Sequence, residues 1–269
     1  MSNQSSLRNL PYVIWFLFYV ILFGSLTMFL ILPFYLVSFV IVSCPFAESF
    51  WRMISGVRPL RIKKEKKRLN PLFEEVYGQA LKFDNDLSDN IEIFIQENMS
   101  INALAYGGGT LVLTKGSIDL LSDDCLKGLI AHELGHFSNR DTTTALFMSI
   151  GNLPMTLLMK FLTETKTKID EATKRAAIMG LFKIAFDGIY YIFRGIELIG
   201  ELIIMPRRRQ SEYDADIYAV ECGYGSELAE ALTQIYEIST EKPQSVKELI
   251  KSTHPSITKR VENIEGYLD

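Results

Sequence analysis

Near its N-terminus the chain has a long stretch that carries no charge, from Asn9 to Ser43. In a helix, which rises about 1.5 Å per residue, this stretch would reach about 50 Å, against about 30 Å for the hydrocarbon core of a bilayer. It is therefore long enough for one tilted membrane span or for two short ones. A cleaved signal peptide has a shorter apolar core, and Cys44 lies in only a loose match to a lipoprotein cleavage site. The sequence predicts an N-terminal transmembrane anchor over residues 1–50.

A cluster of positive charge follows the apolar run. Between residues 52 and 68, eight basic side chains are opposed only by Glu65. Lys and Arg collect on the cytoplasmic side of membrane spans, where they favour contact with anionic lipid headgroups. We therefore expect residues 51–69 to be a basic juxtamembrane linker in an integral membrane protein, with the rest of the chain on the cytoplasmic side. The basic residues are Arg52, Arg58, Arg61, Lys63, Lys64, Lys66, Lys67 and Arg68.

Composition excludes several classes of protein. The net charge of the 269 residues is −4, so the chain as a whole lacks the positive field of a nucleic-acid-binding protein. Its three cysteines are widely spaced, which excludes a disulfide framework and a zinc site made of cysteines alone. The hydrophobic fraction of 48% is too high for a disordered chain. These values suit a folded domain with a membrane anchor.

Beyond the basic segment, the pattern indicates a domain of helices with a few strands. A helix is expected over residues 71–83, because proline suits the first turn of a helix. Runs of β-forming residues predict strands over 91–95, 101–106 and 110–114, the last two joined by a glycine turn. Ser122, followed by two aspartates, is typical of a helix N-terminus. The expected fold class is α+β, mostly α, with one small β-sheet.

Two further apolar stretches lie farther along the chain. Residues 142–159 carry no charge, and residues 176–206 carry five charged side chains, some at the spacing of ion pairs within a helix. Together they predict a helical hairpin inserted over residues 142–206. The composition suits a membrane-embedded hairpin with a polar seam, a hairpin lying on the membrane surface, or a soluble hairpin packed on the domain.

The strongest chemical signal is the motif His132-Glu133-Leu134-Gly135-His136. Residues four apart in a helix lie one turn above each other, so both imidazoles project from one face and can bind one zinc ion. Glu133 then lies within reach of a water molecule on that ion. Apolar residues recur at helical spacing around the motif, so a buried face and a metal face are compatible on one helix. These apolar residues are Leu126, Leu129, Ile130, Leu134 and Phe137.

A catalytic zinc site needs a third protein ligand and one open position. No further His or Cys stands at the short spacing of a compact zinc site, so the ligand must come from farther along the chain. Glu212 and Asp216 are four apart, on one face of a helix that is expected to end near Gly223. One carboxylate can bind the ion while the other holds an imidazole N–H or an arginine.

These motifs together resemble the HtpX-type membrane zinc metallopeptidases, the family that also contains the CAAX prenyl endopeptidases. The resemblance covers most of residues 90–265. It implies a zincin-like metallopeptidase domain over residues 70–269, with a single Zn²⁺ on His132, His136 and Glu212 and with Glu133 as the general base. In chain order, the matching segments are Asn102-Ala103 with the glycine turn, His132 to His136, Arg209 with Glu212 and Asp216, and His254-Pro255 with Arg260.

The resemblance also implies supporting roles for Asp216, His254 and Arg260. His254 would donate a hydrogen bond to the oxyanion that forms during peptide hydrolysis, the alternative being an ordinary loop histidine beside a proline. Arg260 would pair with Asp216 and tie the C-terminal helix to the site, the alternative being a plain surface arginine.

Asn102 and Ala103 are the expected substrate-binding residues. Metallopeptidases with this histidine motif hold an extended peptide along an exposed strand edge, where main-chain hydrogen bonds supply affinity. The strand expected over residues 101–106 is the candidate edge, and an ordinary core strand is the alternative.

The membrane segments depart from the family pattern. Family members often have two spans before the catalytic helix and two after it, whereas this chain has one long apolar block and then a weakly hydrophobic pair. Because Glu212 must meet His132 and His136, the residues between them cross a membrane either twice or not at all.

These features predict a membrane-anchored zinc-dependent endopeptidase acting on membrane or membrane-proximal proteins. Zinc would acidify its water and polarise the scissile carbonyl, while Glu133 would carry the proton from that water to the leaving amine. A deformylase-like hydrolase is one alternative, but Cys125 lacks the sequence context of its cysteine ligand. A non-catalytic membrane scaffold stabilised by zinc is the other, and such a scaffold has no use for Glu133.

Overall fold

The computed structural model describes residues 10–15, 17–18, 33, 36–37, 39–40, 47–144, 147, 152–175, 179–239 and 255–268. The chain divides into two compact units. Unit 1 comprises Met1–Val40 and Phe147–Arg207, and unit 2 comprises Ile41–Leu146 and Arg208–Asp269. Most of the anchor predicted over residues 1–50 lies outside the described residues.

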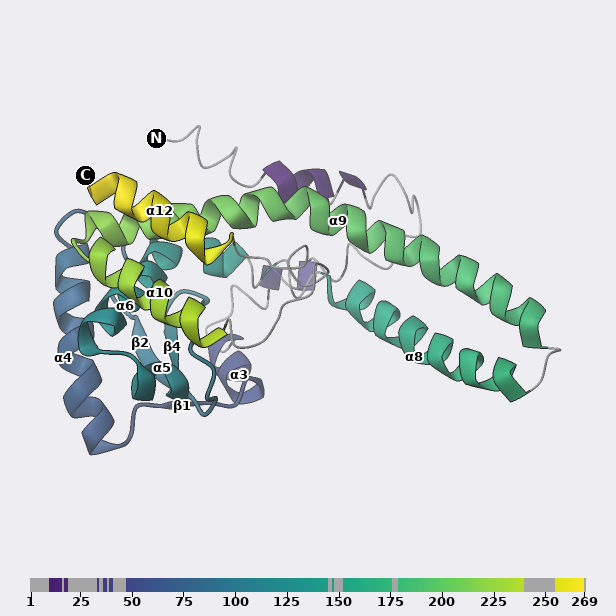
Figure 1. Ribbon diagram of the computed structural model, residues 1–269, viewed down its shortest axis with the longest axis horizontal. Coiled ribbons are helices and arrows are strands. Elements are labelled where there is room, and N and C mark those ends of the chain that lie inside the picture. The colour runs from purple at the N-terminus through teal and green to yellow at the C-terminus, as the bar shows by residue number, and fades with distance from the viewer. Residues whose placement is uncertain are drawn as a thin grey trace. The chain divides into compact units, whose positions relative to one another are not determined.

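Unit 2 contains a mixed sheet with helices packed around it (Figure 1). The sheet has four strands in the order β1-β2-β4-β3, of which β2 and β4 are parallel and the other neighbours antiparallel. Helix predominates over strand, which confirms the predicted α+β class. The elements are α3 (Ala47–Ile54), β1 (Val57–Pro59), α4 (Lys63–Ala80), β2 (Glu92–Gln96), β3 (Ala103–Tyr106), β4 (Thr110–Thr114), α5 (Lys115–Leu120), α6 (Asp123–Ser138), the end of α9 (Met179–Glu221), α10 (Gly225–Ser239) and α12 (Ile257–Leu268).

The three predicted strands are present as β2, β3 and β4, and β3 is the edge strand that the sequence suggested. It pairs with β4 from Ala103 opposite Leu113 to Tyr106 opposite Thr110, and it is last in the strand order. The start of β3 is fixed by its neighbour Asn102, whose backbone N–H donates to Ser117 Oγ at 2.7 Å. Strand β1 was not predicted, because three residues are too few to show an alternating pattern.

Helix α4 shows that the predicted helix start was wrong. The helix begins at Lys63 rather than at Pro71, which lies inside it. Proline lacks the N–H that continues a helix, so contacts on both sides must hold the helix together. Before the proline, Arg68 donates to the backbone carbonyl of Leu121 at 3.0 Å, and the leucines that flank the proline are both buried. The second half of residues 51–69, expected as a linker, is therefore helical.

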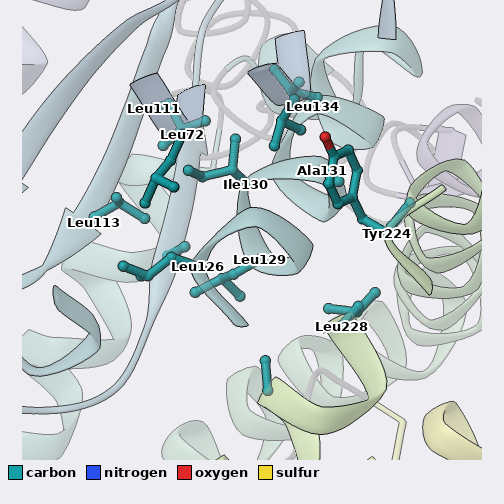
Figure 2. Close-up of a cluster of buried hydrophobic side chains, with 14 of the residues drawn as sticks. Leu72, Leu111, Leu113, Leu126, Leu129, Ile130, Ala131, Leu134, Tyr224 and Leu228 are labelled. Atoms are coloured by element: carbon teal, nitrogen blue, oxygen red, sulfur yellow. The ribbon is translucent and has the colours of Figure 1, made fainter. Parts of the chain in front are cut away.

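Helix α6 carries the histidine motif through the core of unit 2 (Figure 2). It starts as predicted, with the side chain of Ser122 accepting a hydrogen bond from the N–H of Cys125 at 3.1 Å. Most of its residues are buried, so packing fixes its orientation. The side chains of Leu126, Ile130 and Leu134 are fully buried. Their cluster also contains Leu72, Leu111, Leu113, Tyr224 and Leu228.

Two glycines allow neighbouring helices to approach α6 closely. A Cβ atom on Gly128 would lie 2.3 Å from the backbone nitrogen of Leu228 in α10. A Cβ atom on Gly135 would lie 2.9 Å from the Cα atom of Ala215 in α9. Both distances are well below the usual contact distance of about 3.5–4.0 Å between carbon atoms. Because Gly135 lies between the two histidines of the motif, this approach brings α9 directly to the metal face.

Gly128→Ala is expected to lower the free energy of unfolding by about 1–3 kcal/mol, because the new methyl group meets backbone rather than a movable side chain. Thermal or urea unfolding of the purified protein in detergent measures this change. Gly78→Ala is the matched control, since its Cβ would meet nothing within 4 Å and alanine favours helix by about 0.8–1.0 kcal/mol. Equal midpoints for Gly128→Ala and the unmodified protein would show that α10 moves away at no cost.

Unit 1 contains α8 (Leu153–Arg175) and the first part of α9, which lie side by side as a hairpin (Figure 1). Ion pairs link the two helices: Lys166 Nζ lies 2.6 Å from Asp187 Oδ1, and Lys183 binds Asp170. The second helix is longer than expected, since α9 continues past Pro206 to Glu221. No helix in the described part of the chain is both long enough and apolar enough to cross a membrane.

Candidate metal centre

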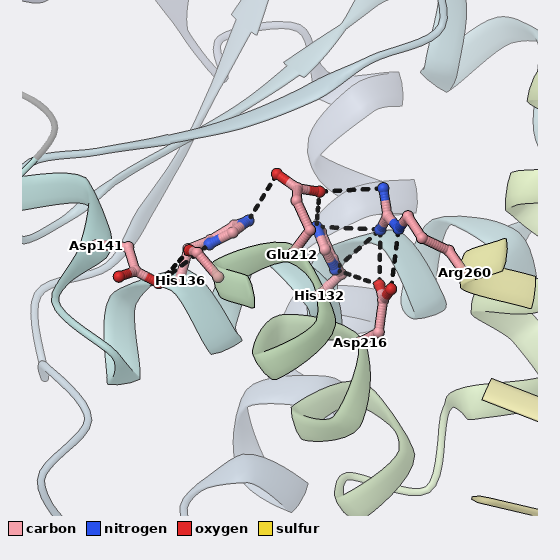
Figure 3. A network of polar contacts seen from close by, with 7 residues as sticks. His132, His136, Asp141, Glu212, Asp216 and Arg260 are labelled. Carbon is pink, nitrogen blue, oxygen red and sulfur yellow. Dashed lines mark hydrogen bonds and ion pairs between the residues drawn. The ribbon is translucent and has the colours of Figure 1, made fainter. Parts of the chain in front are cut away.

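Two helices of unit 2 bring His132, His136 and Glu212 together (Figure 3). The two imidazoles lie one turn apart on α6, with ring centroids 4.8 Å apart. Glu212, on α9, places one carboxylate oxygen 3.6 Å from Nε2 of His132 and the other 3.9 Å from Nε2 of His136. The helix that carries Glu212 ends at Glu221, as predicted, and Gly223 follows it with φ +82°. The tertiary structure therefore supplies the distant carboxylate beside the histidine pair.

The geometry of this cluster suits a single metal ion. One ligand atom from each residue can be chosen so that all three lie within 4.8 Å of one another. Ligands about 2.0–2.2 Å from a tetrahedral zinc ion lie about 3.4 Å apart, so small side-chain movements would close the site around an ion. His132 and Glu212 are buried, and His136 is half-buried. Two imidazoles and a carboxylate are also a donor set that zinc accepts.

Asp216 lies one turn beyond Glu212 and contacts the far side of His132. Its Oδ1 atom is 3.0 Å from Nδ1 of His132, which leaves Nε2 on the side of Glu212. Burial alone would raise the pKa of Asp216, but hydrogen bonds from His132 and Arg260 lower it. A carboxylate in this position orients the imidazole and fixes which nitrogen carries the proton.

Arg260 joins the C-terminal helix α12 to both acidic residues. Its Nη2 and Nε atoms donate to the two oxygens of Asp216 at 2.6 and 2.9 Å. Its Nη1 atom lies 3.1 Å from Oε2 of Glu212. The pairing of Arg260 with Asp216 that the sequence suggested is therefore present, in the two-pronged geometry that guanidinium and carboxylate groups favour.

Asp141 and Ser211 lie near His136 and were not predicted from the sequence. Oδ2 of Asp141 lies 3.7 Å from Nδ1 of His136, and the Ser211 hydroxyl donates to the same oxygen at 2.5 Å. Burial alone would lower the pKa of His136, but Asp141, Glu133 and Glu212 together raise it to about 9. A metal ion that bound this imidazole nitrogen would have to displace a proton from it. Sequence spacing does not reveal Asp141, because its position depends on the turn that ends α6.

The remaining predicted residues lie around this cluster. Glu133 is 5% exposed, and its charge contributes to the raised pKa values of His136 and of Tyr106 at the end of β3, so it is near both. Burial is the larger cause of the raised pKa of Tyr106. Asn102 is exposed just before β3, and Ala103 is buried at its first position. His254 lies outside the described residues.

A His-His-Glu cluster on two helices, with His132 and Glu212 buried, has the donor set of zinc metallopeptidases. The model of peptidase family M48 matches residues 63–268 of this chain. The chain belongs to this family, and the predicted resemblance to HtpX-type metallopeptidases is confirmed.

Relatives and a solved structure agree with this assignment. The chain is 26% identical to a Protease HtpX homolog of Bacteroides fragilis over 99% of this chain and 83% of that protein. It is 22% identical to a Protease HtpX homolog of Bacillus licheniformis over 80% of this chain and 76% of that protein. The crystal structure of S. mikatae Ste24p has a similar fold, with a TM-score of 0.55 and 17% identity. That match covers 96% of this chain and 63% of the Ste24p chain.

Proposed function

We propose that this metalloprotease is a zinc-dependent endopeptidase, anchored in the membrane, that cleaves membrane or membrane-proximal proteins on the cytoplasmic side. One observation carries the proposal. The carboxylate of Glu212 lies 3.6 and 3.9 Å from the Nε2 atoms of the two histidines, although it comes from a different helix. Two imidazoles and a carboxylate that converge in this way form a donor set that zinc accepts.

His132, His136 and Glu212 would hold the zinc ion. When bound, zinc would supply a Lewis acid that polarises the scissile carbonyl and acidifies a water molecule. Asp216 holds Nδ1 of His132, so that the other ring nitrogen stays directed at the ion site. Arg260 keeps Asp216 ionised and fixed by its two hydrogen bonds.

Glu133 is the proposed general base and acid. It would accept a proton from the attacking water as the carbonyl carbon is attacked, and would then deliver that proton to the departing amine. Its nearly complete burial and its place next to His132 in the sequence support this role. His254 is proposed to donate a hydrogen bond to the oxyanion of the tetrahedral intermediate.

The edge of β3 is the proposed substrate-binding strand. An extended peptide can add to this edge through main-chain hydrogen bonds, with Ala103 as the first residue of the strand. The backbone of Asn102 is already used, since its N–H donates to Ser117 and its carbonyl accepts from Thr114 at 3.1 Å. Asn102 would therefore contact substrate through its exposed side chain.

The membrane association is proposed from the sequence pattern. The uncharged residues up to Ser43 would form the anchor, and the basic residues that follow would face anionic headgroups in the cytoplasm. The hairpin within residues 142–206 would either span the membrane or lie against it. In either arrangement the two ligand-bearing helices remain on one side, as a shared metal ion requires.

Casein cleavage by the full-length protein in detergent tests the activity. We expect cleavage to stop when a chelator removes the metal and to return when zinc is added, because the ligand set is complete within one chain. Metal analysis should find about one zinc ion per active chain. Bound zinc without any cleavage of casein or of membrane proteins would instead favour the scaffold alternative.

A further inference from the structure

The turn that ends α6 has an unusual backbone conformation. Helix α6 ends at Ser138, and Arg140 then adopts φ 57°, the one positive φ among the non-glycine residues that the structure describes. A left-handed conformation costs a residue with a side chain about 1–3 kcal/mol and persists only where the surroundings enforce it. Directly after this turn, Asp141 lies beside His136, five positions earlier in the sequence.

Contacts on both sides hold this turn in place. Ser211 is buried and donates to Oδ2 of Asp141 at 2.5 Å. The buried hydroxyl of Thr142 donates to the carbonyl of Gly107, in the turn after β3, also at 2.5 Å. Ser211 directly precedes Glu212 on α9. The Asp141 carboxylate is thus fixed to the helix that supplies the third metal ligand.

Asp141 approaches the nitrogen of His136 that does not face Glu212. Oδ2 of Asp141 lies 3.7 Å from Nδ1, while Nε2 lies on the side of Glu212 (Figure 3). The other histidine has a corresponding partner, since Asp216 lies 3.0 Å from Nδ1 of His132. Each imidazole therefore has an aspartate carboxylate near its Nδ1 atom and the Glu212 carboxylate near its Nε2 atom.

We propose that Asp141 is a positioning residue for His136, and that Ser211 holds Asp141 in the orientation that this role needs. Asp141 keeps the proton of the imidazole on Nδ1, so that the Nε2 lone pair is available to the metal. The proposal rests on the proposed zinc site and extends it to a second pair of supporting residues. Outer partners of metal-binding histidines typically contribute about 10–100-fold to metal affinity.

Zinc affinity of the full-length protein tests this role without any activity measurement. Competition with a chromophoric chelator gives the Kd of zinc for the unmodified protein and for Asp141→Ala. We expect Asp141→Ala to raise the Kd by about 10–100-fold, with a modest fall in the melting temperature of the chelated protein, because the hydrogen bond from Ser211 to the turn is lost. Asp119→Asn is the matched control, because this aspartate pairs only with Lys115 on the surface of α5 among the described contacts. It should leave the Kd unchanged.

A double-mutant cycle tests the part played by Ser211. Ser211→Ala should raise the zinc Kd several-fold in the unmodified background and have no further effect in the Asp141→Ala background, because Ser211 acts through Asp141. If Ser211→Ala raises the zinc Kd by the same factor with and without Asp141→Ala, this part of the proposal is wrong.

The outcomes separate this role from the proposed function. If the unmodified protein binds zinc and Asp141→Ala binds it equally well, the positioning role is wrong and the zinc site stands. A lower melting temperature with an unchanged Kd would mean that Asp141 serves only the turn. If the unmodified protein binds no zinc, both proposals fail.

Discussion

Glu133→Gln is expected to reduce the rate of peptide cleavage by about 100- to 10,000-fold, while zinc content and melting temperature stay close to those of the unmodified protein. Glutamine has nearly the same shape as glutamate but cannot accept the proton of the attacking water. Glu133 is 5% exposed, so an isosteric change is needed to avoid a packing defect. The measurements are kcat for a fluorogenic peptide or casein, bound zinc, and thermal unfolding, all on one preparation.

The control for this prediction is Glu74→Gln, an equivalent change at an exposed position on α4. It should leave cleavage unchanged and so exclude effects of net charge or handling. Near-normal cleavage by Glu133→Gln would remove Glu133 from its proposed role. Parallel loss of zinc and activity would show that Glu133 acts mainly on metal binding.

Glu212→Gln is expected to release the metal and to abolish cleavage for that reason. A neutral amide is a poor zinc ligand. The affinity for zinc should therefore fall by more than the factor of about 10–100 that an outer partner of a ligand contributes. Arg260 keeps both of its hydrogen bonds to Asp216, so the fold should survive. Added zinc should raise the melting temperature of the unmodified protein but not that of the variant, because a ligand stabilises only the state that binds it.

Glu221→Gln serves as the control on the same helix. Glu221 is exposed at the end of α9, away from the cluster of ligands, and its replacement should leave zinc binding intact. Zinc stoichiometry of about one in Glu212→Gln would show that another residue is the third ligand. Asp216 would then be the nearest alternative, since it already contacts His132.

Local patterns predicted the elements that local interactions define. The N-cap at Ser122, the buried stripe of α6 and the strands β2 to β4 all follow from short-range spacing and propensity. Local patterns gave the wrong start for α4, because Pro71 indicated that the helix begins there. Buried leucines and the Arg68 contact to Leu121 stabilise a helix that already began at Lys63. Tertiary contacts there outweigh the usual preference of proline for a first turn.

At the candidate site, too, local spacing predicted some features and tertiary contacts decided the others. The motif from His132 to His136 already places two candidate ligands on one helix face, since four residues make about one turn. The residues alone offered Glu212 and Asp216 as two candidate carboxylates on a separate helix, and the resemblance to the HtpX-type family then implied Glu212 as the metal ligand. Gly135 allows α9 to approach, so that Glu212 lies 3.6 Å from one ring and 3.9 Å from the other.

The sequence by itself determined the fold class and the histidine helix and, through the family resemblance, named the three residues that meet at the candidate metal site. Only the tertiary structure decided that β3 is an edge strand, that Arg260 reaches both acidic residues, and that Asp141 returns to His136. The physical reason is the distance along the chain over which each interaction acts. Helical periodicity acts over about four residues, and its geometry is the same in any protein. The approach of distant segments depends instead on how the whole core packs and on a single left-handed residue, Arg140.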